Sequence, residues 1–118
     1  MRTIEIYDTT LRDGSQGEGV NFSLEDKLSI AKRLDEAGVN FIEGGYPLST
    51  PKDSQFFSRA ASLELKHAQL CAFGMTRRRG MEAHLDPGLT ALRHAGSHAV
   101  PKRGNPSCCH VETGLEVR

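Results

Sequence analysis

Three short runs of apolar residues along the chain have the pattern expected of β-strands. Residues 3–7 alternate apolar and polar side chains, and residues 39–43 and 68–73 are apolar runs that end at glycine. Polar and glycine-rich residues follow each run. The runs lie roughly 30 residues apart, a separation that needs crossover segments, so we expect the strands to lie parallel in one sheet.

The segments between these runs carry the signals of helices. A capping box at Ser23 and Asp26 predicts a helix over residues 24–37, which Gly38 is placed to end. Its apolar residues recur at helical spacing and are Leu24, Leu28, Ala31 and Leu34. A Thr-Pro pair predicts the start of a second helix, over residues 51–64.

The alternating pattern fails after Gly96. Residues 87–95 predict a short third helix that Gly96 closes. A fourth strand should follow, but residues 97–118 begin with a polar stretch that contains two prolines and a glycine. We therefore divide the chain into residues 1–96, with the order β-α-β-α-β-α, and residues 97–118, an irregular C-terminal tail.

Composition narrows the class of protein. A length of 118 residues suits one small domain, and a hydrophobic content of 37% is low for a complete core. The 15 basic and 15 acidic residues balance, so we expect no nucleic-acid partner and no membrane partner. No apolar run approaches the roughly 20 residues of a membrane span. Without a signal-peptide pattern or a disulfide framework, the expected location is cytoplasmic.

The most chemically distinctive residues follow the first predicted strand. Residues 8–16 read Asp-Thr-Thr-Leu-Arg-Asp-Gly-Ser-Gln. Asp13 offers hard oxygen ligands for a divalent cation, and Arg12 offers a planar set of donors for a carboxylate or a developing oxyanion. A plain Asp-Gly turn with solvated side chains would use the same residues, and composition alone does not separate the two readings.

This stretch resembles the first-strand signature of the citramalate, 2-isopropylmalate and homocitrate synthases and their metal-dependent lyase relatives. Residues 41–47, Phe-Ile-Glu-Gly-Gly-Tyr-Pro, and the Pro-Lys-Asp at residues 51–53 are most similar to the citramalate synthase branch. The resemblance covers about residues 2–96 and implies a (β/α)₈ TIM barrel. Because such a barrel needs roughly 250 residues, we expect an N-terminal fragment that holds about the first three βα units.

The resemblance assigns roles to five residues. In the family, the matching arginine stabilises developing negative charge and the matching glutamate lies in the substrate pocket, so Arg12 and Glu43 are expected to be catalytic. Asp13 matches a metal ligand, and Gln16 and Thr76 are expected to bind substrate. Since the carboxyl ends of parallel strands meet at one edge, we expect the residues that follow the first two strands to cluster there. These are Asp8, Arg12, Asp13, Gln16 and Glu43.

Three consecutive arginines, residues 77–79, follow the third predicted strand. They suit either anion binding or a solvated basic loop. We expect Arg78 and Arg79 to be solvated, and Arg77 stays open.

The implied reaction is a Claisen-type condensation of acetyl-CoA with a 2-oxoacid, in which pyruvate would give citramalate for isoleucine or leucine biosynthesis. In the family a divalent metal, Mg²⁺ or Mn²⁺, polarises the carbonyl, and homodimers are expected. The family's metal site also uses a His-x-His pair, which none of the five histidines forms here, so we expect the isolated chain to be inactive. Two alternatives stay open: a hydroxymethylglutaryl-CoA lyase-like carbon–carbon lyase, and a non-catalytic truncated α/β module.

Overall fold

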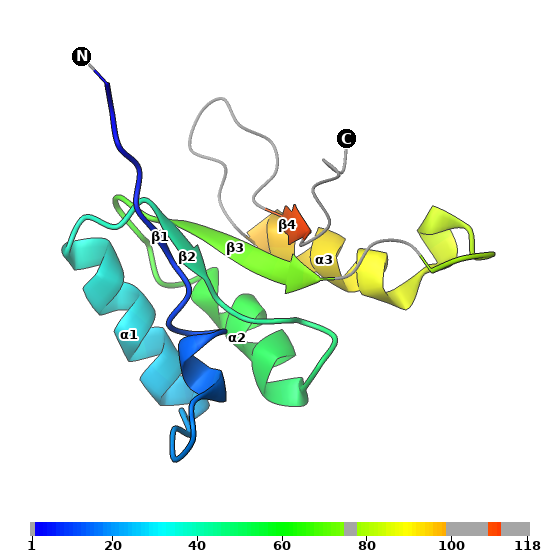
Figure 1. Ribbon diagram of the computed structural model, residues 1–118, viewed down its shortest axis with the longest axis horizontal. Coiled ribbons are helices and arrows are strands. Elements are labelled where there is room, and N and C mark those ends of the chain that lie inside the picture. Colours follow the sequence, from blue (N-terminus) through cyan, green and yellow to red (C-terminus); the bar gives the residue numbers. More distant parts are fainter. Residues whose placement is uncertain (1, 75–77, 99–108, 112–118) are drawn as a thin grey trace.

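A computed structural model describes residues 2–74, 78–98 and 109–111 and shows parallel strands that alternate with helices (Figure 1). The sheet has the order β1-β2-β3-β4, and each neighbouring pair is parallel. Its strands are β1 (Tyr7–Asp8), β2 (Phe41–Glu43), β3 (Gln69–Gly74) and β4 (Cys109–Val111). The helices are α1 (Leu24–Glu36), α2 (Pro51–Ala60) and α3 (Pro87–His98), with short 3₁₀ turns η1 (Gly14–Gln16) and η2 (Ala83–Leu85). This arrangement is that of the first βα units of a TIM barrel and confirms the predicted fold class.

Helix α1 begins at the predicted capping box. The Ser23 hydroxyl accepts from the Asp26 amide at 3.1 Å, and the Asp26 carboxylate accepts from the Ser23 amide at 2.9 Å. Hydrogen bonding of the Asp26 carboxylate to the backbone amide of Ser23, and then to its hydroxyl, lowers the pKa of Asp26 below its ordinary value. Gly38 has a φ of 87°, which confirms the predicted left-handed end of the helix.

Helix α2 begins as predicted and ends earlier. The Thr50 hydroxyl accepts from the Asp53 amide at 3.1 Å, and Pro51 occupies the first helical position. The helix ends at Ala60, whereas the sequence predicted residue 64. The chain leaves the helix through a turn in which the Leu63 amide donates to the Ala60 carbonyl, and Glu64 then takes a φ of 44°. The apolar spacing continued past Ala60 because Leu63 also packs against the core.

None of the helices in the described part of the chain is long and apolar enough to cross a membrane.

The core lies between the helices and one face of the sheet. Figure 1 shows α1 and α2 side by side below the strands. Phe56 of α2 is fully buried, and a Cβ on Gly44 would lie 3.0 Å from its Cδ1 atom, so α2 sits directly against the end of β2. The buried side chains that form this core include Leu28, Ala31, Ile42, Phe56, Phe57, Ala60, Leu70, Ala72, Leu92 and Ala95.

The other face of the sheet carries the candidate chemistry. Side chains alternate between the two faces of a strand, so Ile42 faces the helices and Glu43 faces away. In the register of the sheet Tyr7 pairs with Phe41, and Glu43 pairs with Cys71. These positions line the face that the helices leave uncovered.

Strand β1 is shorter than predicted. The sequence predicted residues 3–7, but the structure has a strand only at Tyr7–Asp8. The Ile6 carbonyl still accepts from the amides of Asn40 and Phe41, yet Ile4 is 85% exposed. β1 lies at the edge of the described sheet, so its first residues lack the burial that their alternating pattern predicted.

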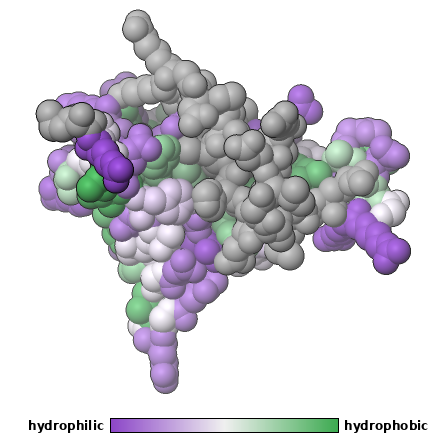
Figure 2. Space-filling view, turned by 45° about the horizontal axis from the view of Figure 1, so that its top comes forward, coloured by the Kyte–Doolittle hydropathy of each residue, from purple (hydrophilic) through white to green (hydrophobic). Residues whose placement is uncertain are grey.

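Figure 2 shows small hydrophobic patches among hydrophilic residues on the coloured part of the face it draws.

Regular structure continues past the predicted boundary at residue 96. Helix α3 runs to His98, because a glycine inside a helix costs stability without necessarily ending it. Strand β4 pairs in parallel with β3, with Ala72 opposite Cys109 and Gly74 opposite Val111. The prediction of an irregular segment is therefore wrong at these positions. The other residues of the C-terminal tail lie outside the described residues.

Candidate active site

An ion pair joins the ends of the first two strands. Arg12, which follows β1, donates from Nε to Oε1 of Glu43, the last residue of β2. The Tyr7 hydroxyl donates to the other oxygen of Glu43, and an Nη of Arg12 lies 3.2 Å from the Asp13 carboxylate. The structure thus brings together three of the predicted site residues, Arg12, Asp13 and Glu43. Glu43 is only 2% exposed, so these partners take the place of water around its carboxylate.

A third strand end contributes an aromatic ring. The guanidinium carbon of Arg12 lies 4.0 Å from the ring centroid of Phe73 in β3, a distance suited to a cation–π interaction. Tyr46 meets the same ring edge to face, with centroids 5.6 Å apart. The sequence analysis missed both aromatic residues as part of the site. The available signal was their position, since each stands at or just after the end of an apolar run.

The turn after β1 holds Arg12 in place. The Thr9 carbonyl accepts from the amides of Arg12 and Gly14, and the Ser15 hydroxyl donates to the Arg12 carbonyl at 2.7 Å. Asp8, predicted to join the cluster, instead accepts from the amide and hydroxyl of Thr10 at 2.9 and 3.1 Å. It therefore orders the turn that presents Arg12.

A cavity of about 300 Å³ lies beside Arg12, between the loop that follows β1 and the loop that follows β2. Gln16, the fourth predicted site residue, lines this cavity. The wall combines polar groups with aromatic rings and includes Arg12, Ser15, Gln16, Asn21, Tyr46, Ser49, Lys52 and Phe73. A small polar ligand is the kind of molecule that such a lining suits.

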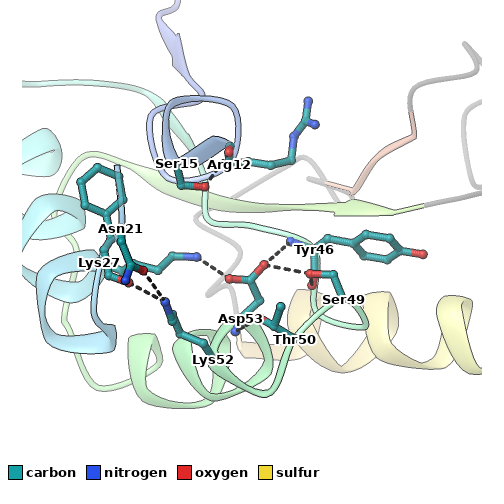
Figure 3. Close-up of polar contacts among 10 residues, drawn as sticks. Arg12, Ser15, Asn21, Lys27, Tyr46, Ser49, Thr50, Lys52 and Asp53 are labelled. Atoms are coloured by element: carbon teal, nitrogen blue, oxygen red, sulfur yellow. Dashed lines mark hydrogen bonds and ion pairs between the residues drawn. The ribbon is translucent and has the colours of Figure 1, made fainter. Parts of the chain in front are cut away.

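Asp53 is a second centre of polar contacts in the wall of this cavity (Figure 3). Its carboxylate accepts from Lys27 Nζ at 2.6 Å, from the Tyr46 amide at 3.1 Å and from the Ser49 hydroxyl at 3.2 Å. Lys52 donates to the Phe22 carbonyl at 2.7 Å and so ties the first loop to α2. Sequence reasoning missed Lys27 and Asp53 as a pair. The signal was a lysine within the apolar face of a predicted helix.

The loop after β3 is anchored by Asp86. The carboxylate of Asp86 accepts from the amides of Arg78 and Gly88, each at 2.8 Å. The Arg78 amide lowers the pKa of Asp86 below its ordinary value; burial raises it, and the amides of α3 add to the lowering. The side chains of Arg78 and Arg79 are exposed, as predicted. Thr76 and Arg77 lie outside the described residues.

Asp13 is the predicted metal ligand, and its side chain is 52% exposed. Among the residues that the structure describes, no three His, Cys, Asp or Glu side chains lie where they could hold one ion together. One carboxylate that already contacts Arg12 does not make a site for a divalent cation. The described residues therefore do not by themselves fit the metal that the resemblance implies.

Comparison with known proteins extends over nearly the whole chain. A family model described as HMGL-like matches residues 3–116. The chain is 48% identical to the (R)-citramalate synthase of Aquifex aeolicus over 97% of its own length and 22% of that protein. For the (R)-citramalate synthase of Streptomyces coelicolor the identity is 46%, over 98% of this chain and 22% of that protein. The 2-isopropylmalate synthase of Listeria welshimeri is 35% identical, over 99% of this chain and 22% of that protein.

These matches confirm the resemblance and correct its extent. They continue beyond residue 96, where the resemblance was expected to end, so residues 97–116 are part of the matched region. The chain spans 22% of the length of these relatives. Because the family model matches more than half of its residues, the chain belongs to the HMGL-like family.

Proposed function

We propose that this chain supplies the first βα units of an acyltransferase that condenses acetyl-CoA with a 2-oxoacid. Pyruvate is the proposed oxoacid and citramalate the product, in isoleucine biosynthesis. Identity to proteins named (R)-citramalate synthase reaches 48%, against 35% for a protein named 2-isopropylmalate synthase, which supports this choice. A cytoplasmic location and a homodimer belong to the same proposal and rest on the family resemblance.

The arrangement around Arg12 carries the proposal. When the enolate of acetyl-CoA attacks the ketone of the oxoacid, the ketone oxygen gains negative charge. The guanidinium of Arg12, whose side chain is 17% exposed, would stabilise that charge with little screening by water. Glu43 and Phe73 hold the guanidinium from the side and from the ring face, so the cation is fixed before substrate arrives.

The other predicted residues keep proposed roles. Glu43 is the second proposed catalytic residue, while Gln16, in the cavity wall, and Thr76 are proposed to bind substrate. Asp13 is proposed as one ligand of Mg²⁺ or Mn²⁺. The described residues alone do not complete such a metal site.

A carbon–carbon lyase is the alternative. The HMGL-like description of the family fits a lyase that cleaves a hydroxymethylglutaryl-CoA-like thioester. The names of the relatives favour the synthase. The two activities separate in an assay, because the synthase releases CoA only when a 2-oxoacid is present, whereas the lyase consumes its thioester alone.

A chimera tests the proposal. The matched segment of the Aquifex aeolicus synthase is replaced by this chain, and CoA release from acetyl-CoA is followed with and without pyruvate. We expect pyruvate-dependent CoA release from the chimera and none from the isolated chain. Replacing Arg12 by Lys in the chimera should lower kcat by about 10²- to 10³-fold, as loss of an oxyanion-stabilising group does.

Arg33→Lys in the same chimera is the matched control. The Arg33 side chain is 83% exposed on α1, so its replacement should leave kcat unchanged. A folded chimera that turns over equally well with Lys at position 12 would contradict the role of Arg12. Consumption of a hydroxymethylglutaryl thioester without pyruvate-dependent CoA release would favour the lyase.

A further inference from the structure

We propose that the ion pair between Lys27 and Asp53 positions Arg12. In this inference the pair fixes the loop between β2 and α2, and the loop sets the place of the Arg12 guanidinium through Tyr46 and Phe73. This positioning role deepens the proposed function and rests on it, because it matters only if Arg12 acts on substrate. The effect of the pair on the place of Arg12 can be measured in the chain without any ligand and is tested separately.

Lys27 is a buried lysine whose ammonium group is paired with a carboxylate and lies near an aromatic ring. It lies on the core-facing side of α1 and is 2% exposed. Its Nζ lies 2.6 Å from an oxygen of Asp53 and 5.0 Å from the centroid of the Phe56 ring. Removal of an ammonium group from water is costly without such partners, so the side chain is held to Asp53. The pair therefore fixes the distance between α1 and the first turn of α2.

The carboxylate of Asp53 also shapes the loop after β2. It accepts from the Tyr46 amide and from the Ser49 hydroxyl, in addition to Lys27. Gly45, with a φ of 139°, lies so close that a Cβ there would be 2.7 Å from a carboxylate oxygen. This close approach requires glycine and leaves the loop little freedom to move away from Asp53.

The loop in turn reaches Arg12 through two aromatic rings. Tyr46 packs edge to face on Phe73, with an interplanar angle of 81°. The Arg12 guanidinium also lies against the Phe73 ring, 4.0 Å from its centroid. A shift of the loop moves Tyr46, releases Phe73 and alters the surface on which Arg12 rests. Lys27 and Asp53 are thus positioning residues, which act on Arg12 through other groups.

An ion pair with only a structural role would behave differently. Its removal would weaken the α1–α2 contact but leave the surroundings of Arg12 unchanged in the molecules that remain folded. A measurement of those surroundings therefore separates the two roles. The Nε–Hε group of Arg12 is such a probe, because the Phe73 ring lies close enough to shift its NMR signal.

The experiment uses the full 118-residue chain labelled with ¹⁵N. The Arg12 Nε–Hε signal is assigned by its loss in Arg12→Lys, and Phe73→Leu gives its position without the ring. We expect Asp53→Asn and Lys27→Met to move the signal by at least about half of the way toward the Phe73→Leu position. Asp35→Asn is the matched control: Asp35 is another buried carboxylate, 4% exposed, and it accepts from three backbone amides away from the cavity.

The outcomes are distinct. A signal that stays at its wild-type position in folded Asp53→Asn, or that moves equally in Asp35→Asn, overturns the inference. If Asp53→Asn does not fold, Gly45→Ala decides, because it displaces the loop and keeps both charges. An unmoved signal in folded Gly45→Ala also overturns the inference. Addition of pyruvate to the wild-type chain tests only the proposed function: an Arg12 signal unaffected by pyruvate counts against substrate binding there and leaves the positioning result intact.

Discussion

Replacement of Asp35 by Asn should destabilise the chain more than its conservative nature indicates. Asp35 stands in the last turn of α1, where Oδ1 accepts from the amides of His67 and Ala68, both at 2.7 Å. Its Oδ2 accepts from the Lys66 amide at 2.9 Å. One side chain thus binds three successive amides at the entrance to β3 and joins α1 to the sheet. Asparagine has the same shape and only one acceptor oxygen.

The expected loss follows from these three hydrogen bonds. With Asn, the amide of Lys66 faces an NH₂ group and loses its acceptor, which costs about 1–3 kcal/mol. The two remaining bonds lose their charge assistance, at about 0.5–1 kcal/mol each. The free energy of unfolding should therefore fall by about 2–5 kcal/mol, a large part of the roughly 5–15 kcal/mol typical of a domain.

The loss should depend on pH. Burial raises the pKa of Asp35, but hydrogen bonds from the amides of Ala68, Lys66 and His67 outweigh it, so the folded pKa lies below its ordinary value. A lowered folded pKa contributes stability that is complete above the unfolded value of about 3.9 and is lost as the pH falls through the folded pKa. The difference between wild type and Asp35→Asn should thus be largest near neutral pH and shrink in acid.

Urea denaturation of wild type and Asp35→Asn, followed by far-UV circular dichroism at pH 7, 5, 4 and 3, measures this loss of unfolding free energy and its pH dependence. Glu36→Gln is the control, since Glu36 is the next residue and makes an exposed ion pair with Arg33 at 3.1 Å. That change should cost less than about 0.5 kcal/mol. A loss below about 1 kcal/mol for Asp35→Asn, or a loss that does not change between pH 7 and pH 3, would refute the reasoning.

Three further changes test other parts of the fold, each by urea denaturation at pH 7. Phe56→Ala removes a fully buried ring and should cost about 3–5 kcal/mol; a loss under about 2 would mean that the contact with β2 is loose. Gly74→Ala places a methyl group 2.6 Å from Cδ2 of Leu92 and should cost about 1–3 kcal/mol, whereas an unchanged midpoint would show that α3 moves away freely. Thr50→Ala removes the N-cap of α2 and should cost about 1 kcal/mol; no loss would indicate that solvent replaces the cap.

Local chemistry made the helix starts predictable. The capping box at Ser23 and the Thr50–Pro51 pair act within four residues, so the sequence contains all the groups involved. The strand limits depend on partners elsewhere in the chain. Residues 3–6 alternate as a strand should, but β1 has one neighbour in the described sheet and forms only at Tyr7–Asp8. For the same reason β4, which depends on β3, could not be recognised from its own residues.

The part of the candidate site that lies in or near the motif of residues 8–16 could be predicted from the sequence. Arg12, Asp13 and Glu43 could be selected from their residue types and their places after apolar runs, and the structure brings them into contact. The contacts of Phe73 with Arg12 and of Lys27 with Asp53 could not be predicted, because they join elements 26 or more residues apart in sequence. Lys27 and Asp35 shared a recognisable signal, since each interrupts the apolar face of α1 and each is buried with a partner.

The register of the sheet also decides whether the ion pair of the candidate site can form. Side chains alternate along β2, so a slip of one residue against β1 would turn Glu43 toward the helices and Ile42 toward Arg12. Glu43 would then lie among the apolar side chains of the core, away from Tyr7 and Arg12, and Ile42 would stand where Glu43 binds Arg12. Both changes are unfavourable, because the carboxylate would lose its two partners inside the core and the guanidinium would lose its ion pair with Glu43. The apolar pattern that selects the register for the core therefore also selects the register in which Arg12 and Glu43 pair.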